Sequence, residues 1–453
     1  MTDPGTDEDR ATANRTAGTA GTGHRAGHST PDLRRPRTAP GCRPGSRPRR
    51  RWLRWAALST SLAVLGAAGA GWTLYEKLDD NIRTDVGTAK ELKRYAAERP
   101  VAPAGEAKNI LLLGSDSRDG SNSAYGHDEG SPRSDTAILL HLSADRRRAT
   151  GVSLPRDLMV DLPACRQADG SHIEPQFAQF NWAFQFGGAA CAIRTVEKLT
   201  GVRIDHHLVV DFAGFKSLVD TVGGVDVCLP GAVRDRDSKL DLPAGRQTLG
   251  GEDALSFVRA RHGLGNGSDT DRMHRQQQFL GSLVKKVRSN GVLLNPAKLY
   301  PVVHSATSAL TADEGLDSLG ELYELVRGAR DIPEDQVRFL TVPRQSYSRD
   351  GNRDELVQPA AGQLFAQLRE DRPVRVGDID GKTQRAAPAP SVRPERPARN
   401  HAPGSAVRSS MRTEAGPQAR PGDDGKGKAP PVYPGTTAAH DICTTDGAEN
   451  RVN

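Results

Sequence analysis

The chain contains little of what a protein folded from end to end requires. Of its 453 residues only 36% are hydrophobic and 5% are aromatic, whereas 47 are glycine and 30 are proline. Such a composition excludes a continuous core along the whole length. The apolar residues concentrate between positions 109 and 368, which predicts one sizeable folded domain between polar ends.

Several motifs are also missing. The sequence has no GxxxxGK[ST], no HExxH and no GxSxG, and its cysteines have no CxxC or CxxH spacing. These absences argue against a P-loop nucleotide site, a zinc protease, a nucleophile elbow and a zinc cluster. His206, His207 and His262 lack ligand spacing, and we interpret them as structural or exposed.

Acidic residues are absent from positions 33–75, although nine arginines lie between positions 34 and 54. The uncharged run from Trp55 to Tyr75 follows at once and is long enough to cross a bilayer. A basic arm of this kind could bind nucleic acid nonspecifically, but its position beside the run favours the positive-inside flank of a membrane anchor. The N-terminus is then cytoplasmic and the rest of the chain is outside.

A cleaved signal peptide is the alternative, because Ala68–Gly–Ala70 is similar to a cleavage site. The long region before the run favours an uncleaved anchor. The whole chain then divides into a disordered basic arm (1–54), a transmembrane signal anchor (55–75), a stalk and linker (76–107), a catalytic domain (108–345), a peripheral helix (346–371) and a disordered Pro/Arg/Gly-rich tail (372–453).

Four of the five cysteines would lie outside the membrane, where disulfides form. Cys42 is on the cytoplasmic side and should be free. Cys165 and Cys191 flank one loop-to-helix stretch and are the favoured pair, which leaves Cys228 and Cys443 as a possible second pair.

Short apolar runs alternate with longer amphipathic segments in the expected domain. The runs predict strands at 109–113, 136–142, 149–154, 158–162 (beside the preceding one), 204–210, 225–229 and 337–342. The segments predict helices at 189–199, 212–222, 252–258, 272–287, 298–310 and 319–330. This alternation predicts a layered α/β domain.

Charged residues stand at the ends of the first three strands. Asp116 follows the first, Arg133 and Asp135 precede the second, and Arg156 follows the third. Ligands of open α/β sheets collect at such ends, and two carboxylates there could share a divalent ion with a diphosphate. The simpler interpretations are a turn-capping aspartate and surface ion pairs, including one between Arg156 and Asp157.

A second group of basic residues comes later in the chain. Arg259 and Arg261 fall on one face if their segment is extended. Arg272 and Gln276 share one helix face near the helix N-terminus, where backbone donors and the dipole favour an anion.

The other face of this helix carries Leu280, Leu283, Val284 and Val287. The simplest interpretation is that these residues pack in the core. The more specific interpretation is that they form one wall of a pocket for a lipid chain. Since no protein nucleophile is evident, the simplest chemistry is in-line attack by a hydroxyl group on phosphorus.

The motifs occur in an order that resembles the LytR-CpsA-Psr family, of the actinobacterial type. They are GSDSR (114–118), RSDT (133–136), SLPRD (153–157), FNWA (180–183) with the glycine pair at 187–188, GGVD (223–226), LPAGRQ (242–247), ALSFVRAR (254–261) and DRMHRQQ (271–277).

The resemblance implies an α/β/α layered sandwich with a mixed central sheet behind one transmembrane helix. It implies a phosphotransferase that moves a glycopolymer from a polyprenyl diphosphate carrier onto peptidoglycan, at the muramic acid C6 hydroxyl group, as a phosphodiester. It also implies residue roles. Asp116 and Asp135 would hold Mg²⁺ (or Mn²⁺); Asp116, Asp135, Arg156, Arg259 and Arg261 would be catalytic; and Arg133, Asn181, Arg272, Arg275 and Gln276 would bind the substrate.

Two other functions stay open at this point. A membrane-bound transcriptional attenuator would need DNA recognition, but the basic arm has no helix-turn-helix pattern and predicts no specific nucleic-acid contact. A diphosphatase that releases the polymer to water would use the same site as the transferase.

Overall fold

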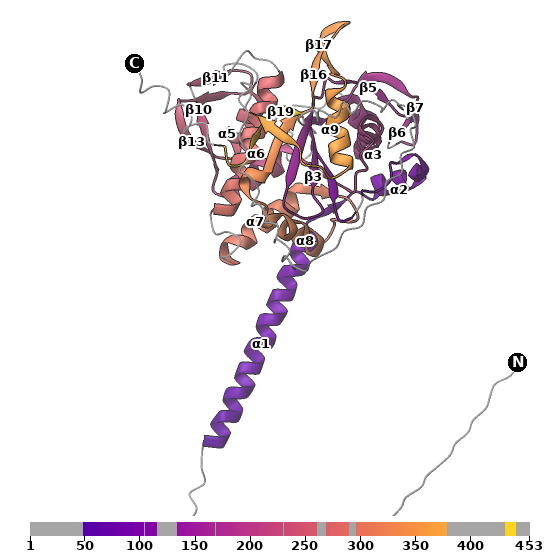
Figure 1. Cartoon of the computed structure of the whole chain (residues 1–453). Helices are drawn as coiled ribbons and strands as arrows, with labels where there is room; N and C mark the ends of the chain where they lie inside the picture. Colours follow the sequence, from indigo (N-terminus) through magenta and orange to yellow (C-terminus); the bar gives the residue numbers. More distant parts are fainter. Residues whose placement is uncertain are drawn as a thin grey trace, which may run out of the picture. The chain divides into compact units, whose positions relative to one another are not determined.

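The computed structural model (Figure 1) describes residues 49–103, 105–115, 134–167, 169–229, 231–260, 269–289, 296–377 and 431–440, without the side chains of 49–51, 269–271, 289 and 296–299. Its helices are α1 (Arg49–Asp79), α2 (Val86–Arg94), α3 (Asn181–Thr200), α4 (Phe212–Thr221), α5 (Gly251–Arg259), α6 (Asp269–Ser289), α7 (Pro296–Ala309), α8 (Leu319–Arg330) and α9 (Ala360–Arg369), with short 3-10 turns at Ala96–Glu98 and Glu334–Gln336. Its strands are β1 (Arg83–Thr84), β2 (Lys108–Ser115), β3 (Ser134–Leu142), β4 (Ala149–Leu154), β5 (Met159–Leu162), β6 (Cys165–Arg166), β7 (His172–Ile173), β8 (Gln176–Gln179), β9 (His206–Val210), β10 (Val225–Leu229), β11 (Val233–Asp235), β12 (Leu240–Leu242), β13 (Gly245–Leu249), β14 (Leu310–Ala312), β15 (Val337–Thr341), β16 (Arg344–Tyr347), β17 (Asp350–Leu356), β18 (Arg375–Gly377) and β19 (Val432–Thr437).

A mixed sheet forms the centre of the domain. Within the described residues its nine strands run in the order β1-β14-β9-β2-β3-β4-β15-β19-β18. Strand β2 pairs parallel with β9 and antiparallel with β3, while β4 pairs antiparallel with β3 and parallel with β15. The predicted mixed sheet is confirmed, and the predicted runs 109–113, 136–142 and 149–154 form its middle.

Both faces of this sheet are buried, which explains the unbroken apolar run of β2. Alternate side chains point to opposite faces. Leu111, Leu113 and Leu139 pack in one core with residues of α3 and α9. Ile110 and Phe339 pack in another core, together with residues of α6 and α8. The arrangement is the expected α/β/α sandwich.

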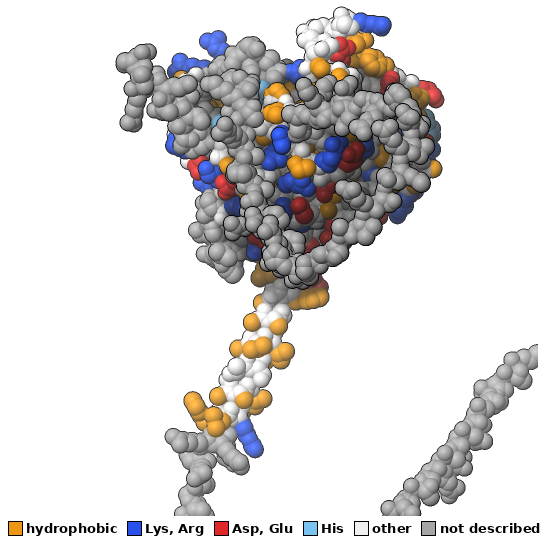
Figure 2. Space-filling model, in the orientation of Figure 1, with side chains coloured by type: hydrophobic (Ala, Val, Ile, Leu, Met, Phe, Trp, Pro, Cys, Tyr) orange, Lys and Arg blue, Asp and Glu red, His pale blue; other side chains and the backbone are white. Residues whose placement is uncertain are grey.

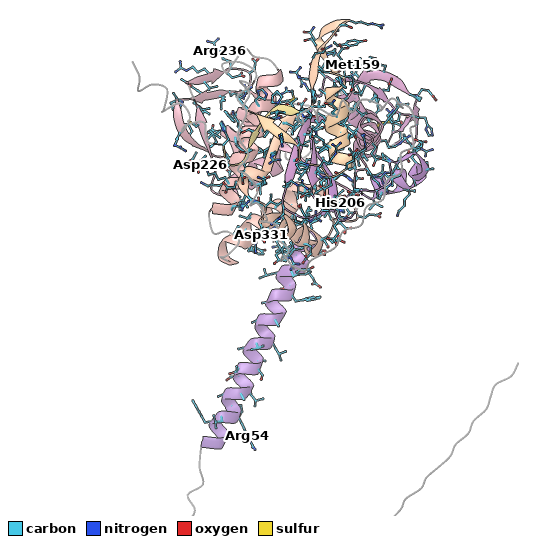
Figure 3. The ribbon with its side chains drawn as sticks, viewed as in Figure 1. Arg54, Met159, His206, Asp226, Arg236 and Asp331 are labelled. Carbon is cyan, nitrogen blue, oxygen red and sulfur yellow. A yellow bond between two sulfur atoms is a disulfide. The ribbon has the colours of Figure 1, made fainter. Side chains whose placement is uncertain are left out.

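A third core lies in a lobe at the side of the sheet. It contains residues of α4, α5, α6 and α7 and of the ribbons β10–β13 and β11–β12. Asp226 of β10 and Arg236 of the β11–β12 turn mark these ribbons in Figure 3. Helix α4 begins where the Asp211 carboxylate accepts a hydrogen bond from the Gly214 N–H (2.7 Å). It ends before Gly223 and Gly224, which have φ values of 82° and 79°, the left-handed conformation that glycine permits.

Helix α3 begins earlier than its sequence pattern indicates. The pattern predicts a helix from 189, but the helix starts at Asn181 and contains a kink at Gly187 and Gly188. Gly188 has φ 59° and ψ −150°, which interrupts the helical periodicity on which the prediction rested. The helix ends as expected at Gly201, which has φ 64°.

The segment 76–107, predicted to be a stalk and linker, is packed into the domain. Strand β1 pairs with β14, and Ile82 is buried against Ala312 and Leu316. The Asp79 carboxylate accepts a hydrogen bond from the N–H of Leu319 at the start of α8 (2.7 Å). The charged composition that indicated a stalk instead supplies capping and ion-pair partners.

The C-terminal predictions also need correction. Residues 344–356 form the β16–β17 hairpin, so the peripheral helix expected over 346–371 is limited to α9. Strands β18 and β19, in the tail predicted to be disordered, extend the central sheet, and β19 pairs with β15. Tyr433 of β19 is buried beside α9 in the same core. A strand as short as VYPGTT gives little sequence signal within a Pro/Gly-rich tail.

Strand β5 exists as predicted, but it pairs with β8 in a separate ribbon and not with β4. The favoured disulfide between Cys165 and Cys191 is present and ties strand β6 to α3. Cys228 is disulfide-bonded as well. Its predicted partner Cys443 lies outside the described residues, so that pairing stays a prediction.

The predicted anchor 55–75 lies within α1. Residues Trp52–Asp79 are long and apolar enough to cross a membrane, judged by length and composition. Large apolar side chains along this helix, such as Trp55, Leu62 and Leu65, are exposed.

We expect Glu197→Ala to destabilise the domain strongly. Glu197 is 3% exposed, pairs with Arg99 at 2.7 Å and accepts the N–H of Ile204 at 2.9 Å. Its removal leaves a charge in the interior without its counterion, which lowers the free energy of unfolding by about 3–5 kcal/mol. Thermal unfolding followed by circular dichroism measures this. Arg327→Ala, which breaks an exposed pair with Glu324, should cost about 1 kcal/mol or less; equal losses in both variants would contradict the prediction.

His141 should make the domain less stable in mild acid. Burial lowers the pKa of His141 below its ordinary 6.5, although the neighbouring Asp371 opposes the shift. The unfolded chain therefore takes up a proton at a higher pH than the folded chain, so stability falls as the pH drops below about 6.5. His141→Gln should reduce the loss of stability between pH 7.5 and pH 5. An unchanged difference between these two pH values would show that another group is responsible.

Candidate active site

Four strand ends meet at one edge of the central sheet. Gly114 pairs with Val210, Ser115 with Ser134, and Ala137 with Leu154. The carboxyl ends of β2, β4 and β9 therefore lie beside the start of β3. This register brings Asp135 and Arg156, predicted from their strand-end positions, to the same edge, as the rule for open α/β sheets leads one to expect.

Asp135 and Arg156 contact each other directly. The Nη1 of Arg156 lies 2.8 Å from Oδ1 of Asp135, and its Nε lies 3.2 Å from Oδ2 of Asp157. The guanidinium thus has two carboxylates that hold its plane in one orientation. The ion pair between Arg156 and Asp157, which is the simpler interpretation of the sequence, is therefore present. The contact between Arg156 and Asp135 is present as well.

A cavity of about 470 Å³ opens beside this edge, between the sheet and helices α4, α5 and α6. Its inner wall is apolar and includes Ile138, Leu208, Phe215, Leu280 and Leu283. Charged and polar groups line it as well: Asp135, Asp211, Asp235, Asp237, Ser238, Arg259, Arg272 and Gln276. Such a cavity suits a ligand with an apolar chain and an anionic head.

The stripe of apolar residues on α6 is divided between a cavity wall and the cores, and its contact with a lipid chain stays a prediction. Leu280 and Leu283 line the cavity. Val284 packs in the core beneath the sheet, and Val287 packs in the core of the side lobe.

Two elements position the basic residues of the cavity. Arg259 is the last residue of α5, and its guanidinium lies 4.6 Å from the centre of the Phe212 ring, a cation–π distance. Arg272, in the first turns of α6, is 6% exposed. Gln276, one turn later, donates to the carbonyl oxygen of Val258 (3.2 Å) and approaches Oγ1 of Thr136 (3.4 Å), and so links α6 to α5 and β3.

Two further predicted residues lie around this group. Arg275 is buried and donates to the carbonyl oxygen of Ala260, at the end of α5. Asn181 is buried at the start of α3, and its backbone N–H donates to the carbonyl oxygen of Arg156 (3.0 Å). Both contacts hold segments that carry site arginines. Direct binding of substrate by either residue stays a prediction.

Asp116, Arg133 and Arg261 lie outside the described residues, so their predicted roles stay predictions. Among the residues that the structure describes, no group of three or more His, Cys, Asp or Glu side chains could hold a metal ion. Asp135 is the one predicted metal ligand that the structure describes.

Sequence reasoning missed Asp211, Phe212 and Asp157 as parts of the site. The signal for the first two was available, because they directly follow β9 just as Asp116 follows β2. No sequence signal indicates that Asp157 binds both Arg156 and Arg353. Arg353 is almost two hundred residues away in the chain, and its Nη1 lies 3.2 Å from Oδ1 of Asp157.

Comparisons with known proteins give the family of the chain. A model of the LytR_cpsA_psr family matches residues 75–370. The cell wall biosynthesis protein LcpA of Corynebacterium glutamicum is 33% identical over 329 residues, which cover 66% of this chain and 61% of LcpA. The probable cell wall biosynthesis protein LcpB of the same organism is 36% identical over 229 residues, which cover 49% of this chain and 52% of LcpB.

A more distant relative is the polyisoprenyl-teichoic acid–peptidoglycan teichoic acid transferase TagU of Enterococcus faecalis, 32% identical over 248 residues, which cover 54% of this chain and 72% of TagU. A solved LytR-Csp2A-Psr enzyme from Actinomyces oris superposes with a TM-score of 0.46 at 24% identity, over 60% of this chain and 93% of that one. The chain spans roughly half to three fifths of the two Corynebacterium relatives. Since the family model matches well over half of the chain, the protein belongs to the LytR-CpsA-Psr family.

Proposed function

We propose that the protein is a membrane-anchored phosphotransferase that moves a glycopolymer from a polyprenyl diphosphate carrier onto peptidoglycan, at the muramic acid C6 hydroxyl group. The observation that carries the proposal is the cavity, whose apolar wall and basic groups match the two halves of such a donor. The TagU relative, named as a teichoic acid transferase that uses a polyisoprenyl-linked donor, supports it.

The apolar wall would hold the first isoprene units of the carrier. Each buried methylene group contributes about 0.8 kcal/mol, so even a few units would retain the donor at the cavity. Arg259 and Arg272 line the same cavity and would bind the diphosphate oxygens. Their planar forks of donors match phosphate geometry better than lysine ammonium groups would.

Asp135 fits the role of a magnesium ligand. Its side chain is 37% exposed and lines the cavity, and the described contact to Arg156 involves its Oδ1. Mg²⁺ commonly uses one or two carboxylates together with substrate phosphates, so Asp135 would share the ion with Asp116 and the diphosphate. When bound, the ion would neutralise charge on the transferred phosphate.

The reaction would be an in-line displacement at phosphorus. The acceptor oxygen forms the new P–O bond to the phosphorus that carries the glycan, and the bond from this phosphorus to the bridging oxygen of the diphosphate breaks. Polyprenyl phosphate leaves and takes up the proton that the acceptor hydroxyl group loses. Arg156, oriented by Asp135 and Asp157, would stabilise the charge that develops on the phosphate oxygens. The chain would thus orient two substrates and supply charge, without a covalent intermediate on the protein.

The proposed location follows from the anchor and the cysteines. With the arginine-rich arm in the cytoplasm, the domain would lie outside the membrane, where carrier and peptidoglycan meet. The Cys165–Cys191 disulfide is compatible with this oxidising space.

The central test separates transfer from hydrolysis. The purified protein is incubated with a glycan linked to polyprenyl diphosphate, with and without peptidoglycan oligomers, and the products are identified by mass spectrometry. We expect a phosphodiester-linked conjugate only when the oligomers are present. Free glycan phosphate in both reactions would favour the diphosphatase.

Arg156→Lys should reduce transfer by about 100-fold, because an ammonium group cannot contact Asp135, Asp157 and a phosphate with the same planar geometry. The rate of conjugate formation at saturating donor measures this. The control is Arg327→Lys on the exposed surface of α8, which should transfer at the wild-type rate. If the Arg156→Lys variant transferred at the wild-type rate, the guanidinium group of Arg156 would not be required for the reaction.

Leu283→Trp should weaken donor binding by filling the cavity. The larger side chain would take the volume assigned to isoprene units, so the donor KM should rise more for a long carrier than for a carrier of two units. Leu283→Met, which keeps the volume, serves as the control, and thermal unfolding checks that both variants fold. An equal effect on both carriers would place the lipid elsewhere.

A further inference from the structure

Aromatic rings are exposed on the domain surface beyond the candidate site. Phe177 of β8 is 52% exposed and Trp182 of α3 is 36% exposed. Each has an aromatic neighbour: the Phe177 and Tyr347 ring centres are 6.0 Å apart, and those of Trp182 and Phe186 are 5.7 Å apart. We call these four residues the aromatic shelf. They come from β8, α3 and the β16–β17 hairpin, so folding brings them from distant parts of the sequence.

The aromatic shelf begins beside Arg156. Trp182 directly follows Asn181, whose N–H donates to the carbonyl oxygen of Arg156. Phe177 lies in the β5–β8 ribbon, where it pairs with Asp161 of β5. Asp157 lies in the turn between β4 and β5, and Asp161 is the third residue of β5. The Phe177–Tyr347 pair thus lies on the β5–β8 ribbon and the hairpin, and the Trp182–Phe186 pair lies in the first turns of α3.

Asp157 connects the hairpin to the site. One carboxylate accepts from both Arg156 (3.2 Å) and Arg353 of β17 (3.2 Å). Its backbone carbonyl accepts the N–H of Asp354 (3.1 Å). Met159 of β5 lies beside the hairpin in Figure 3, and Figure 2 shows hydrophobic side chains on the surface at this place. Tyr347 is thus held in a fixed relation to the reacting groups.

The aromatic shelf and the cavity belong to opposite layers of the sandwich. The cavity lies on the α6 side of the sheet, whereas α3 packs on the other side. Because the proposed donor occupies the cavity on the α6 side, the surface outside that cavity is left for the second substrate, the acceptor.

We propose that the aromatic shelf binds the glycan strand of the acceptor peptidoglycan. A pyranose ring has an apolar C–H face that stacks on aromatic rings, and its hydroxyl groups at the rim need polar partners. Gln176 and Gln345 are exposed at the edge of the two strands and can supply them. The inference rests on the proposed function, and it adds the part of the chain that recognises the acceptor.

The test combines binding and kinetics of the full-length protein. The variant Phe177→Ala with Tyr347→Ala removes the outer pair, and Phe177→Trp with Tyr347→Phe keeps it aromatic. Tyr323→Ala, on α8 and 60% exposed, is the matched control. We expect the double alanine variant to raise the acceptor KM about tenfold. Donor KM should stay at the wild-type value, and the aromatic variant and the control should behave as wild type.

Binding is measured separately by co-sedimentation with purified peptidoglycan from which other polymers have been removed. The double alanine variant should sediment less than wild type, and the aromatic variant should sediment equally. This measurement needs no turnover, so it tests the aromatic shelf even if the donor reaction proves to be hydrolysis.

Three results would overturn the inference. Transfer with an unchanged acceptor KM would show that the rings do not contact the acceptor. A raised donor KM with an unchanged acceptor KM would assign the aromatic shelf to the donor glycan. Equal sedimentation of the wild type and the double alanine variant would exclude a binding role. Failure of the wild type to form any conjugate, while it hydrolyses the donor, would instead contradict the proposed function.

Discussion

The hydrogen-bond register of β2, β3, β4 and β9 is the constraint on which the candidate site depends. It sets the ends of three strands beside the beginning of a fourth and places Asp135 within 2.8 Å of Arg156. A shift of one residue between β3 and β4 would turn alternate side chains to the other face of the sheet. It would separate this pair and also move Leu139 from the core beside α3 to the other face of the sheet. A change of this register would therefore disrupt both the hydrophobic core and the candidate site.

The sandwich also separates two environments across one sheet. On the α6 side the sheet residues Ile138 and Leu208 face a cavity with an apolar wall, which both aspartates and arginines also line. On the α3 side the sheet is fully packed, and the layer beyond it carries exposed rings near Arg156. We assign the lipid-linked donor to the first side and the glycan acceptor to the second.

Segments at both ends of the domain pack against its core and pair with its sheet, although their amino-acid composition does not predict this. Arg99, from the predicted linker, pairs with buried Glu197 and donates to the carbonyl oxygen of Ile204. Strand β19, from the predicted tail, extends the sheet next to β15. In both cases a few well-placed hydrogen bonds and buried side chains attach a polar segment to a core built elsewhere. Composition averaged over a long window conceals such local contributions.

The sequence by itself determined the central strands of the sheet and the edge at which Asp135 and Arg156 meet. Continuous apolar runs bounded by glycine and proline predicted the central strands, because a strand covered on both faces needs apolar side chains at every position. Ordered motifs predicted the family, and the strand-end rule identified Asp135 and Arg156. Only the tertiary structure decided that Phe212 lies under Arg259, that Asp157 joins Arg156 to Arg353, and that Phe177 meets Tyr347. These contacts join positions far apart in the chain, and no local periodicity records which distant side chains will share a surface.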